Sequence, residues 1–322
     1  MSNSPLPITF NPLDPSFRAD PYPQYKTLYA GPPPVMNLFI PLVPVARYRD
    51  LMVVLRDHER FSSVPPRQFA NPDDLKITGN APTLVSSDPP VHSRLRRLVS
   101  RAFSPTRIRA MEPRIRQIAC ELLDRVSERG SLEVMEEFAV PLPVRIIAEM
   151  LGVDPANYQQ FREWSNTLID SSNRSGPGAP MPPNIRRAFL ELREYFSAEI
   201  ERRRRAPGDD LISMLVAAHD ESEALSADEL MGFIILLLIA GNETTTNLIG
   251  NGVLALARHA GQLELLARTP VLLPSAIEEM LRYDSPVQST IRVAKAQSEV
   301  GGTSVPAGAL MFTLVGAGNR DP

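Results

Sequence analysis

The chain has 322 residues, 43% of them hydrophobic, so it is long enough to bury the core of one large domain. Its single cysteine, Cys120, excludes a disulfide-stabilised scaffold and a cysteine-based zinc or iron–sulfur site within this sequence. The net charge of −3 argues against a protein dedicated to nucleic acid. The longest strongly apolar stretch, Leu230–Gly241, is shorter than the roughly 20 residues that cross a bilayer, and the N-terminus lacks a signal-peptide pattern. We therefore expect a cytoplasmic protein without a membrane segment.

The N-terminal 60 residues are rich in proline and predict extended chain with short elements. In chain order we expect a helix from Asp20 through Tyr29, strands at Val35–Ile40 and Leu42–Tyr48, and a helix at Tyr48–Asp57. Because proline lacks an N–H group, the prolines place both strands at a sheet edge. Residues 65–82 have no periodicity and predict a long loop, a length typical of binding segments or lids.

From Asp88 onward the pattern is mostly helical. The helices that we expect are 88–103, 104–130, 138–151, 155–170, 183–205 and 210–218, with a Gly/Pro/Ser loop at 171–183. Ser226 and Glu229 form a capping box that opens a helix running to about His259. The first half of this helix is apolar on nearly all faces, which predicts burial in the core.

A further helix runs to Tyr283, and short strands follow at 287–295, 299–300 and 309–315. The fold class that these elements predict is mainly α with small peripheral β-sheets. No internal repeat and no low-complexity tract interrupts this pattern.

The long helix contains an unusual polar segment, Ala240–Thr246, with a glycine, an acid and three threonines. The hydroxyl of Thr244 can bond the carbonyl of Ala240 four residues earlier, which bends a helix and opens its ladder to water or a ligand. A carboxylic acid beside that hydroxyl, here Glu243, suits proton transfer. The alternative is a polar patch where the helix meets solvent or a neighbouring helix, and the residues alone favour neither.

Two other charged groupings stand out. Glu279 and Arg282 share a helical face and alone indicate an exposed ion pair. His92 and Arg96 also share a face, and such a pair suits an anion such as a carboxylate or phosphate, although a solvated basic face is the simpler interpretation. The arginine run 202–205 closes a helix and indicates a solvated end that matches the helix dipole.

Taken in order, four motifs resemble those of the cytochrome P-450 family of haem-thiolate monooxygenases, of the soluble bacterial type. Residues 88–97 resemble the entry to its C helix, 240–245 the oxygen-activation motif of its I helix, 279–282 its ExxR motif, and 319–322 the tetrapeptide before its meander. The resemblance covers the whole chain. It implies a single haem-binding domain over residues 1–322, with an N-terminal extended region (1–60) and a helical core (61–322) that ends in short strands after 286.

The resemblance also implies roles for particular residues. Glu243 and Thr244 become the catalytic acid–alcohol pair that relays protons during oxygen activation, and Glu279 and Arg282 a structural network near the haem. The residues implied in haem binding are His92, Arg96 and Arg292 at the propionates, with Ala240, Gly241 and Thr244 over the ring. The substrate is implied to lie among segments 65–85, 171–183, 235–240 and 287–291, with contacts from Val85, Leu236, Ile239, Val287, Gln288 and Ile291.

The implied cofactor is haem b, and the implied reaction inserts one oxygen atom of O2 into an apolar small molecule. Electrons come from NAD(P)H through a ferredoxin reductase and a ferredoxin, which is implied to dock on a basic surface that includes Arg94, Arg97 and Arg101. We expect a monomer that binds no nucleic acid. Two alternatives remain, a non-catalytic helical ligand-binding or sensor protein and a peroxide-driven member of the same fold, and the Glu243–Thr244 pair disfavours both.

The chain departs from the family at the iron ligand. The family's axial cysteine lies in a Phe-x-x-Gly-x-x-x-Cys-x-Gly stretch, which we expect beyond Pro322, so no metal ligand is expected within these residues. Cys120 lies in the middle of a helix without those glycines and does not substitute. The sequence is then either a piece of a longer chain or a truncated product that cannot bind haem. We favour the first, because the chain stops inside a family motif.

Overall fold

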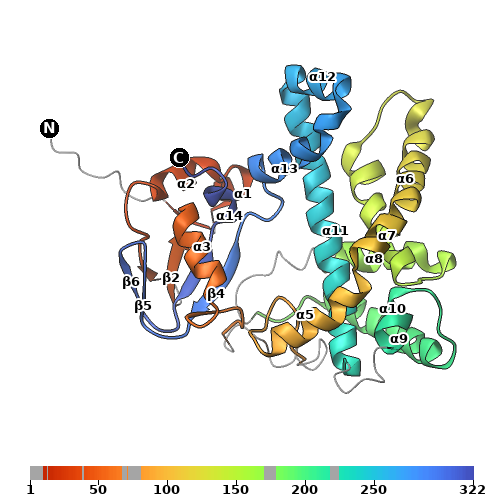
Figure 1. Cartoon of the computed structure of the whole chain (residues 1–322), viewed down its shortest axis with the longest axis horizontal. Coiled ribbons are helices and arrows are strands. Elements are labelled where there is room, and N and C mark those ends of the chain that lie inside the picture. The colour runs from red at the N-terminus through yellow and green to blue at the C-terminus, as the bar shows by residue number, and fades with distance from the viewer. Residues whose placement is uncertain are drawn as a thin grey trace. The chain divides into compact units, whose positions relative to one another are not determined.

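The computed structural model describes residues 10–12, 14–37, 40–66, 71, 81–169, 179–217 and 225–322. The chain is mainly helical with small sheets, as the sequence predicts (Figure 1). It divides into two compact units, which we call the sheet unit (Met1–Pro66 with Asn251–Pro322) and the helical unit (Arg67–Gly250). Most of the loops expected at 65–82 and 171–183 lies outside the described residues.

The sheet unit contains a five-stranded sheet in the order β1-β2-β7-β4-β3 and a separate β5-β6 hairpin. The strands are β1 Met36–Asn37, β2 Pro41–Val45, β3 Phe61–Ser62, β4 Thr290–Ala294, β5 Ser298–Val300, β6 Thr303–Val305 and β7 Leu310–Thr313. Helix α3 (Tyr48–Arg56) lies over this sheet (Figure 1) and buries Leu51 and Val54 in a core shared with Val43, Phe61 and Met311. The strands are therefore joined to their covering helix by one apolar cluster.

The expectation that both N-terminal strands lie at a sheet edge is wrong for β2. This strand pairs antiparallel with β1 and parallel with β7, so it lies inside the sheet. Its prolines are tolerated because β1 is short: β1 pairs only with Pro41 and Leu42, and Pro44 is not required to donate a ladder bond to it. Pro44 lies opposite Phe312 in the parallel ladder with β7.

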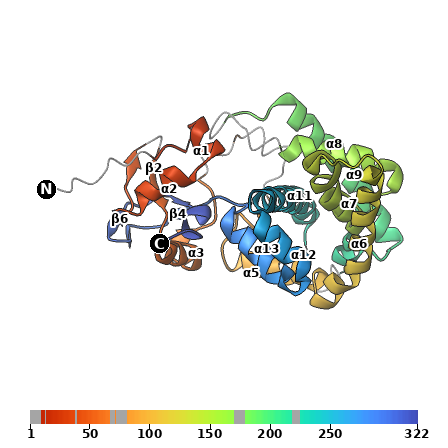
Figure 2. The same ribbon diagram turned by 90° about the horizontal axis from the view of Figure 1, so that it is seen from above.

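The prediction of a single helix before Tyr283 is also wrong, because the structure has three separate helical segments there. The segments are α12 Ala260–Arg268, a 3-10 turn at Pro270–Leu272 and α13 Leu273–Tyr283. Pro270 has no N–H to continue α12, and it begins the 3-10 turn instead. Figure 2 shows α12 and α13 side by side. The unit's remaining helices are α1 Pro15–Ala19, α2 Tyr22–Leu28 and α14 Val315–Gly318.

The helical unit contains most of the long helix α11 (Ala227–Arg258), whose residues from Asn251 onward belong to the sheet unit. Its other helices are α5 Val91–Ala102, α6 Pro105–Ser127, α7 Pro141–Met150, α8 Tyr158–Ile169, α9 Pro183–Arg205 and α10 Leu211–Ala217. Leu230, Ile234 and Leu238 of α11 recur every four residues and are buried in the large core of this unit. Figure 2 looks along α11.

The start of α11 follows the sequence prediction. The Ser226 amide donates to the Glu229 carboxylate at 2.8 Å, and the Glu229 amide donates to the Ser226 hydroxyl at 3.1 Å, so the capping box is confirmed. Among the helices in the described ranges, α11 alone is long and apolar enough to cross a membrane. In this helix 33% of the most apolar window is buried, and Leu230, Ile234 and Leu238 lie in the core of the helical unit.

Two expectations in the helical unit need correction. The helix expected at 138–151 begins as a π-helical turn, Met135–Ala139, and continues as α7 only from Pro141, which cannot donate a backbone hydrogen bond. The arginine run 202–205 is not wholly solvated, because Arg203 is only 4% exposed. Its guanidinium contacts Asp210, Glu199 and the carbonyl oxygen of Gly152.

Candidate functional site

Side chains in the polar segment of α11 form two kinds of hydrogen bond, one within the helix and others to neighbouring segments. Thr244 donates its hydroxyl hydrogen to the carbonyl oxygen of Ala240 at 2.7 Å, which confirms the predicted bond within the helix. Thr246 instead donates to the carbonyl oxygen of Ala139 at 3.0 Å, at the end of the π-helical turn. The Asn242 amide nitrogen donates to the Ser165 hydroxyl on α8. The segment therefore contains both the predicted hydrogen bond within the helix and the contacts with neighbouring segments that the alternative interpretation predicts.

Glu243 is half-buried and has no hydrogen bond or ion pair within the part of the chain that the structure describes. It lines a polar pocket of about 560 Å³ in the helical unit. The pocket residues come from the π-helical turn, α7, α8 and α11: Glu136, Val140, Val144, Arg162, Asn166, Asn242, Glu243, Thr246 and Asn247. A cavity of this size and polarity holds several waters, because one water takes up about 30 Å³ of the liquid. The Glu243 carboxylate therefore has access to water, with no competing partner in the described part of the chain.

Gly241 allows α11 to approach α7 closely. A Cβ atom at this position would lie 2.7 Å from Cδ1 of Ile147, closer than packed carbon atoms approach. Ala240 beside it is exposed. Within the helical unit, Ala240, Gly241, Glu243 and Thr244 thus lie on consecutive turns of one rigid helix, and the glycine is needed for packing whether or not a ligand is bound.

The predicted anion-binding pair lies one turn apart on α5. His92 is half-buried and Arg96 is exposed, and neither side chain has a hydrogen bond or ion pair with another described residue. Leu95, Leu98 and Val99 of the same helix are buried in the unit's core. The pair is therefore held on a fixed helix and remains available to an anion.

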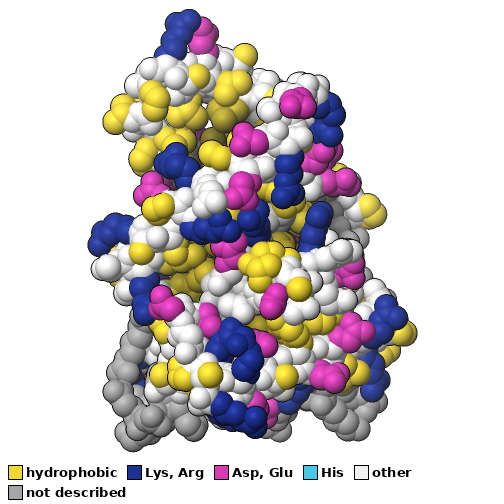
Figure 3. Space-filling view, turned by 90° about the vertical axis from the view of Figure 1, so that its right-hand side faces the viewer, with side chains coloured by type: hydrophobic (Ala, Val, Ile, Leu, Met, Phe, Trp, Pro, Cys, Tyr) yellow, Lys and Arg dark blue, Asp and Glu magenta, His cyan; other side chains and the backbone are white. Residues whose placement is uncertain are grey.

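The basic surface predicted around α5 is only partly available. Arg94 forms an ion pair with Glu229 of α11, and Arg97 also has an interaction partner. The side chain of Arg101 lies outside the described part of the chain. On the face of the molecule shown in Figure 3, Lys and Arg side chains are interspersed with Asp and Glu side chains.

Glu279 and Arg282 of α13 form a two-pronged ion pair in the sheet unit. The Arg282 Nε and Nη2 atoms each lie 2.7 Å from a Glu279 carboxylate oxygen, and Nη1 donates to the carbonyl oxygen of Asn319 at 2.9 Å. The hydrogen bonds from Arg282 hold the pKa of the Glu279 carboxyl below its usual value. The predicted pair is present, and its third bond ties α13 to the tetrapeptide 319–322.

Each polar residue of this tetrapeptide has its own anchor. The Arg320 guanidinium carbon lies 3.4 Å from the ring centre of Tyr22 and 4.5 Å from that of Tyr283. Asp321 accepts from Arg47 Nη1 at 3.1 Å and from the amide of Tyr48 at 2.9 Å. Sequence reasoning missed Tyr22 and Arg47, which lie over 260 residues from their partners and carry no local signal.

The predicted substrate residues lie in both units. Val287 and Ile291 of the sheet unit are exposed by 41% and 43%, and Val85 of the helical unit by 64%, so these apolar side chains lack full cover in the described structure. Leu236 and Ile239 of α11 are half-buried. Near β4 lie the last predicted substrate residue, Gln288, and Arg292, which was predicted to bind a haem propionate.

Gln288 is engaged by its own unit. Its Oε1 accepts from Tyr25 at 3.1 Å, and its Nε2 donates to the carbonyl oxygen of Ser285 at 2.8 Å. Arg292 Nη1 donates to the neighbouring carbonyl of Ile291 at 2.9 Å. The side-chain amide of Gln288 therefore connects α2 to the segment that precedes β4.

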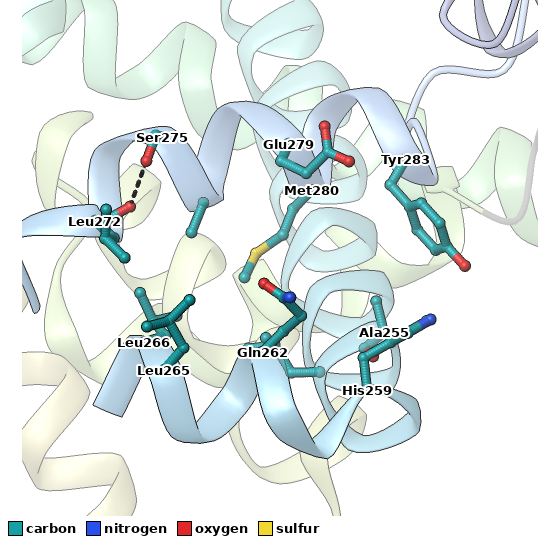
Figure 4. A pocket seen from close by; sticks show the side chains of 12 residues that line it. Ala255, His259, Gln262, Leu265, Leu266, Leu272, Ser275, Glu279, Met280 and Tyr283 are labelled. Carbon is teal, nitrogen blue, oxygen red and sulfur yellow. Dashed lines mark hydrogen bonds between the residues drawn. The ribbon is translucent and has the colours of Figure 1, made fainter. Parts of the chain in front are cut away.

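A second pocket, of about 340 Å³, lies between α12, α13 and the end of α11 in the sheet unit (Figure 4). Leu265, Leu266 and Met280 make its lining largely apolar. Glu279 borders it, but its carboxylate points away from Gln262 and the leucines of α12 (Figure 4). The charged pair of α13 is thus directed at the tetrapeptide and not at this pocket.

The fold and these motifs have well-matched relatives, although no protein-family model matches the chain. Vitamin D(3) 25-hydroxylase of Pseudonocardia autotrophica is 40% identical over 316 residues, which are 95% of this chain and 75% of that protein. The 6-deoxyerythronolide B hydroxylase of Saccharopolyspora erythraea is 37% identical over 325 residues, covering 95% of this chain and 78% of that protein. Among solved structures, the cytochrome P-450 PksS of the Bacillus subtilis bacillaene polyketide synthase has a TM-score of 0.86 at 34% identity, over 97% of this chain and 79% of that one.

These matches define the class of this protein. It is a bacterial haem-dependent monooxygenase with the fold that the four motifs predict. The chain belongs to the cytochrome P-450 family. It is therefore an oxidoreductase whose cofactor is haem b, with electrons derived from NAD(P)H.

The described residues fit the organic part of haem better than its iron. Haem carries two carboxylates, and His92 and Arg96, which have no side-chain partner among the described residues, suit one of them. Cys120, the chain's single cysteine, is exposed on α6 and does not suit an axial thiolate, which must be buried against the ring. Among the described residues no cluster of three or more His, Cys, Asp or Glu side chains could hold a metal ion.

Proposed function

We propose that the enzyme oxidises an apolar small molecule, using O2 and electrons that a ferredoxin delivers from NAD(P)H through a ferredoxin reductase. Haem supplies the oxygen-activating chemistry when it is bound. The observation that carries the proposal is the Thr244–Ala240 hydrogen bond beside a Glu243 carboxylate that has no partner among the residues the structure describes. A pure binding or sensor protein has no need of such a proton-handling pair.

Each residue has a defined task in this proposal. Glu243 takes up protons from the polar pocket, and the Thr244 hydroxyl, held by the Ala240 carbonyl, passes them on. His92, Arg96 and Arg292 bind the haem propionates, while Ala240 and Gly241 lie against the ring. Glu279 and Arg282 act structurally, by fixing α13 to Asn319.

The substrate is proposed to be apolar because the residues assigned to it are. Val85, Leu236, Ile239, Val287 and Ile291 offer only hydrocarbon surface, which favours a largely apolar ligand. Two relatives are named for vitamin D(3) and 6-deoxyerythronolide B, and we propose a substrate of comparable kind. We further propose a cytoplasmic monomer.

The test separates proton delivery from substrate binding. In the haem-loaded enzyme, Thr244→Ala should bind substrate as the parent does, yet lower the fraction of NAD(P)H converted into product by about tenfold or more, within the range that general acid–base groups contribute. Thr245→Ala is the matched control, because Thr245 is the exposed neighbour in the same motif. Equal coupling in parent and Thr244→Ala would refute the assignment of Thr244, and an enzyme that never consumes NAD(P)H would refute the monooxygenase proposal.

A further inference from the structure

The helical unit contains a buried polar atom without a partner, directly beside the catalytic acid. Asn242 is 1% exposed, and its Nδ2 donates to Ser165 while its Oδ1 has no hydrogen-bond partner among the described residues. A buried acceptor left unpaired costs about 1–3 kcal/mol. Such a group therefore favours any donor that can reach it.

The protein groups around Asn242 are already engaged. The hydroxyl of Thr246, one turn along α11, donates to Ala139, and the hydroxyl of Thr244 donates to Ala240. Ser165 accepts from the other end of the same amide. The hydroxyl hydrogens of Thr244 and Thr246 are taken, and Ser165 meets the amide at Nδ2 and not at Oδ1, so a water is the donor that suits Oδ1.

The polar pocket described above is the nearest source of such a donor. Asn242 and Glu243 both line it, together with exposed Arg162, Asn166 and Glu136. Oδ1 is closed to solvent in this conformation, but exposed side chains at the mouth move at little cost and admit a single water. A water there donates one hydrogen to Asn242 Oδ1 and has a second hydrogen for a carboxylate.

We propose that Asn242 is a positioning residue that holds one water from this pocket in contact with the Glu243 carboxylate. This inference rests on the proposed role of Glu243. In the transfer, an O–H bond of the held water breaks and an O–H bond to a Glu243 oxygen forms. The held water regains a hydrogen from the next water, and the same exchange continues outward to bulk solvent, which supplies the one proton that Glu243 takes up.

The two bonds of Asn242 have separable functions. Its Nδ2 joins α11 to α8 through Ser165, and its Oδ1 binds the water. Ser165→Ala removes the first function and leaves the second, whereas Asn242→Leu removes both. Asn242→Ser restores a small oxygen acceptor and leaves room for water, so it serves as the conservative rescue.

The experiment uses the haem-loaded enzyme and two readouts. A high-resolution crystal structure should place a water within about 3.2 Å of Asn242 Oδ1 and of a Glu243 oxygen in the parent and in Ser165→Ala, and no such water in Asn242→Leu. The fraction of NAD(P)H converted to product should fall about fivefold in Asn242→Leu, with a larger solvent deuterium isotope effect. Asn242→Ser should recover most of both.

The outcomes are distinguishable from a failure of the proposed function. A protein donor found on Oδ1, or a site that stays dry in the parent, would overturn the water site even in a fully active enzyme. If Ser165→Ala lowered coupling as much as Asn242→Leu, the residue would act only through helix packing and the proposal would be wrong. An enzyme with the water in place but unaffected by Glu243→Gln would instead contradict the role of Glu243.

Discussion

Two arginines, one in each unit, show how burial and not motif membership determines what an ion pair contributes. Arg282 of the sheet unit belongs to a motif visible in the sequence, but 47% of its side chain is exposed. Arg203 of the helical unit lies in an unremarkable arginine run, and its side chain is 5% exposed. Both engage a carboxylate and a backbone carbonyl. Only Arg203 does so where water cannot replace the lost partner, so it should matter more for stability.

The largest effect is expected for Arg203→Met. This change keeps most of the side-chain volume but leaves Asp210, Glu199 and the Gly152 carbonyl without their shared donor. Removing one partner of a buried pair costs about 3–5 kcal/mol, measured here as the free energy of urea unfolding. Arg204→Met, at a 39% exposed neighbour paired with Glu201, is the control and should cost under about 1 kcal/mol. Equal losses for the two variants would contradict the comparison.

The next largest effect is expected for Gly152→Ala. Gly152 has φ +69°, and a Cβ there would lie 2.6 Å from Arg203 Nη2 and 2.7 Å from Asp210 Oδ2. Gly130 has nearly the same backbone, φ +67°, with nothing within 4 Å of an added Cβ. Gly130→Ala should therefore cost only the left-handed strain of about 1–2 kcal/mol. Gly152→Ala should cost roughly 1–3 kcal/mol more by overpacking the ion pair.

Hydrogen exchange locates this damage. Amides near the C-terminal end of α9 and the start of α10 should lose protection in Gly152→Ala and keep it in Gly130→Ala. If both glycine variants unfolded at the same urea concentration, the close approach of Arg203 to Gly152 would not contribute to stability.

The features that the sequence predicted correctly all join residues that are close in sequence. The capping box, the Thr244–Ala240 bond and the Glu279–Arg282 pair all join residues three or four apart, where helix geometry alone brings them together. Helix α11 was predicted from its apolar run for the same reason. Local periodicity thus predicted most of the helices and the Thr244–Ala240 bond of the candidate site.

The unpredicted features depend on contacts distant in sequence. Asn242 meets Ser165 across 77 residues, and Arg47 meets Asp321 across 274. The interior position of β2 depends on its parallel pairing with β7, at the other end of the chain. Burial of Arg203 likewise depends on the turn at Gly152. Residue spacing within one segment does not predict such contacts, because the packing of whole helices and strands against one another determines them.

A smaller effect is expected for Arg282→Met in the sheet unit. It removes the two-pronged pair with Glu279 and the bond to Asn319, but the side chains are 47% and 57% exposed and water partly replaces these bonds. We expect a loss of about 1 kcal/mol in unfolding free energy and faster hydrogen exchange near Asn319. Arg268→Met, in the more exposed Arg268–Glu264 pair, is the control and should change neither. A loss as large as that of Arg203→Met would remove the contrast between the units.

The smallest effect is a pH dependence carried by Glu279. Its pKa is lowered chiefly by the hydrogen bonds from Arg282, so it lies below the ordinary glutamate value of the unfolded chain. A carboxyl with a depressed folded pKa stabilises the fold fully above the unfolded pKa, about 4.3, and loses that contribution as pH falls through the folded pKa. Unfolding free energies of the parent and Glu279→Gln should therefore differ slightly, by less than about 1 kcal/mol at this exposure, at neutral pH. The difference should shrink below about pH 4, because the parent carboxyl is then also neutral. In an Arg282→Met background it should be absent at every pH, and a difference that persisted there would show that another group, not Arg282, stabilises the carboxylate.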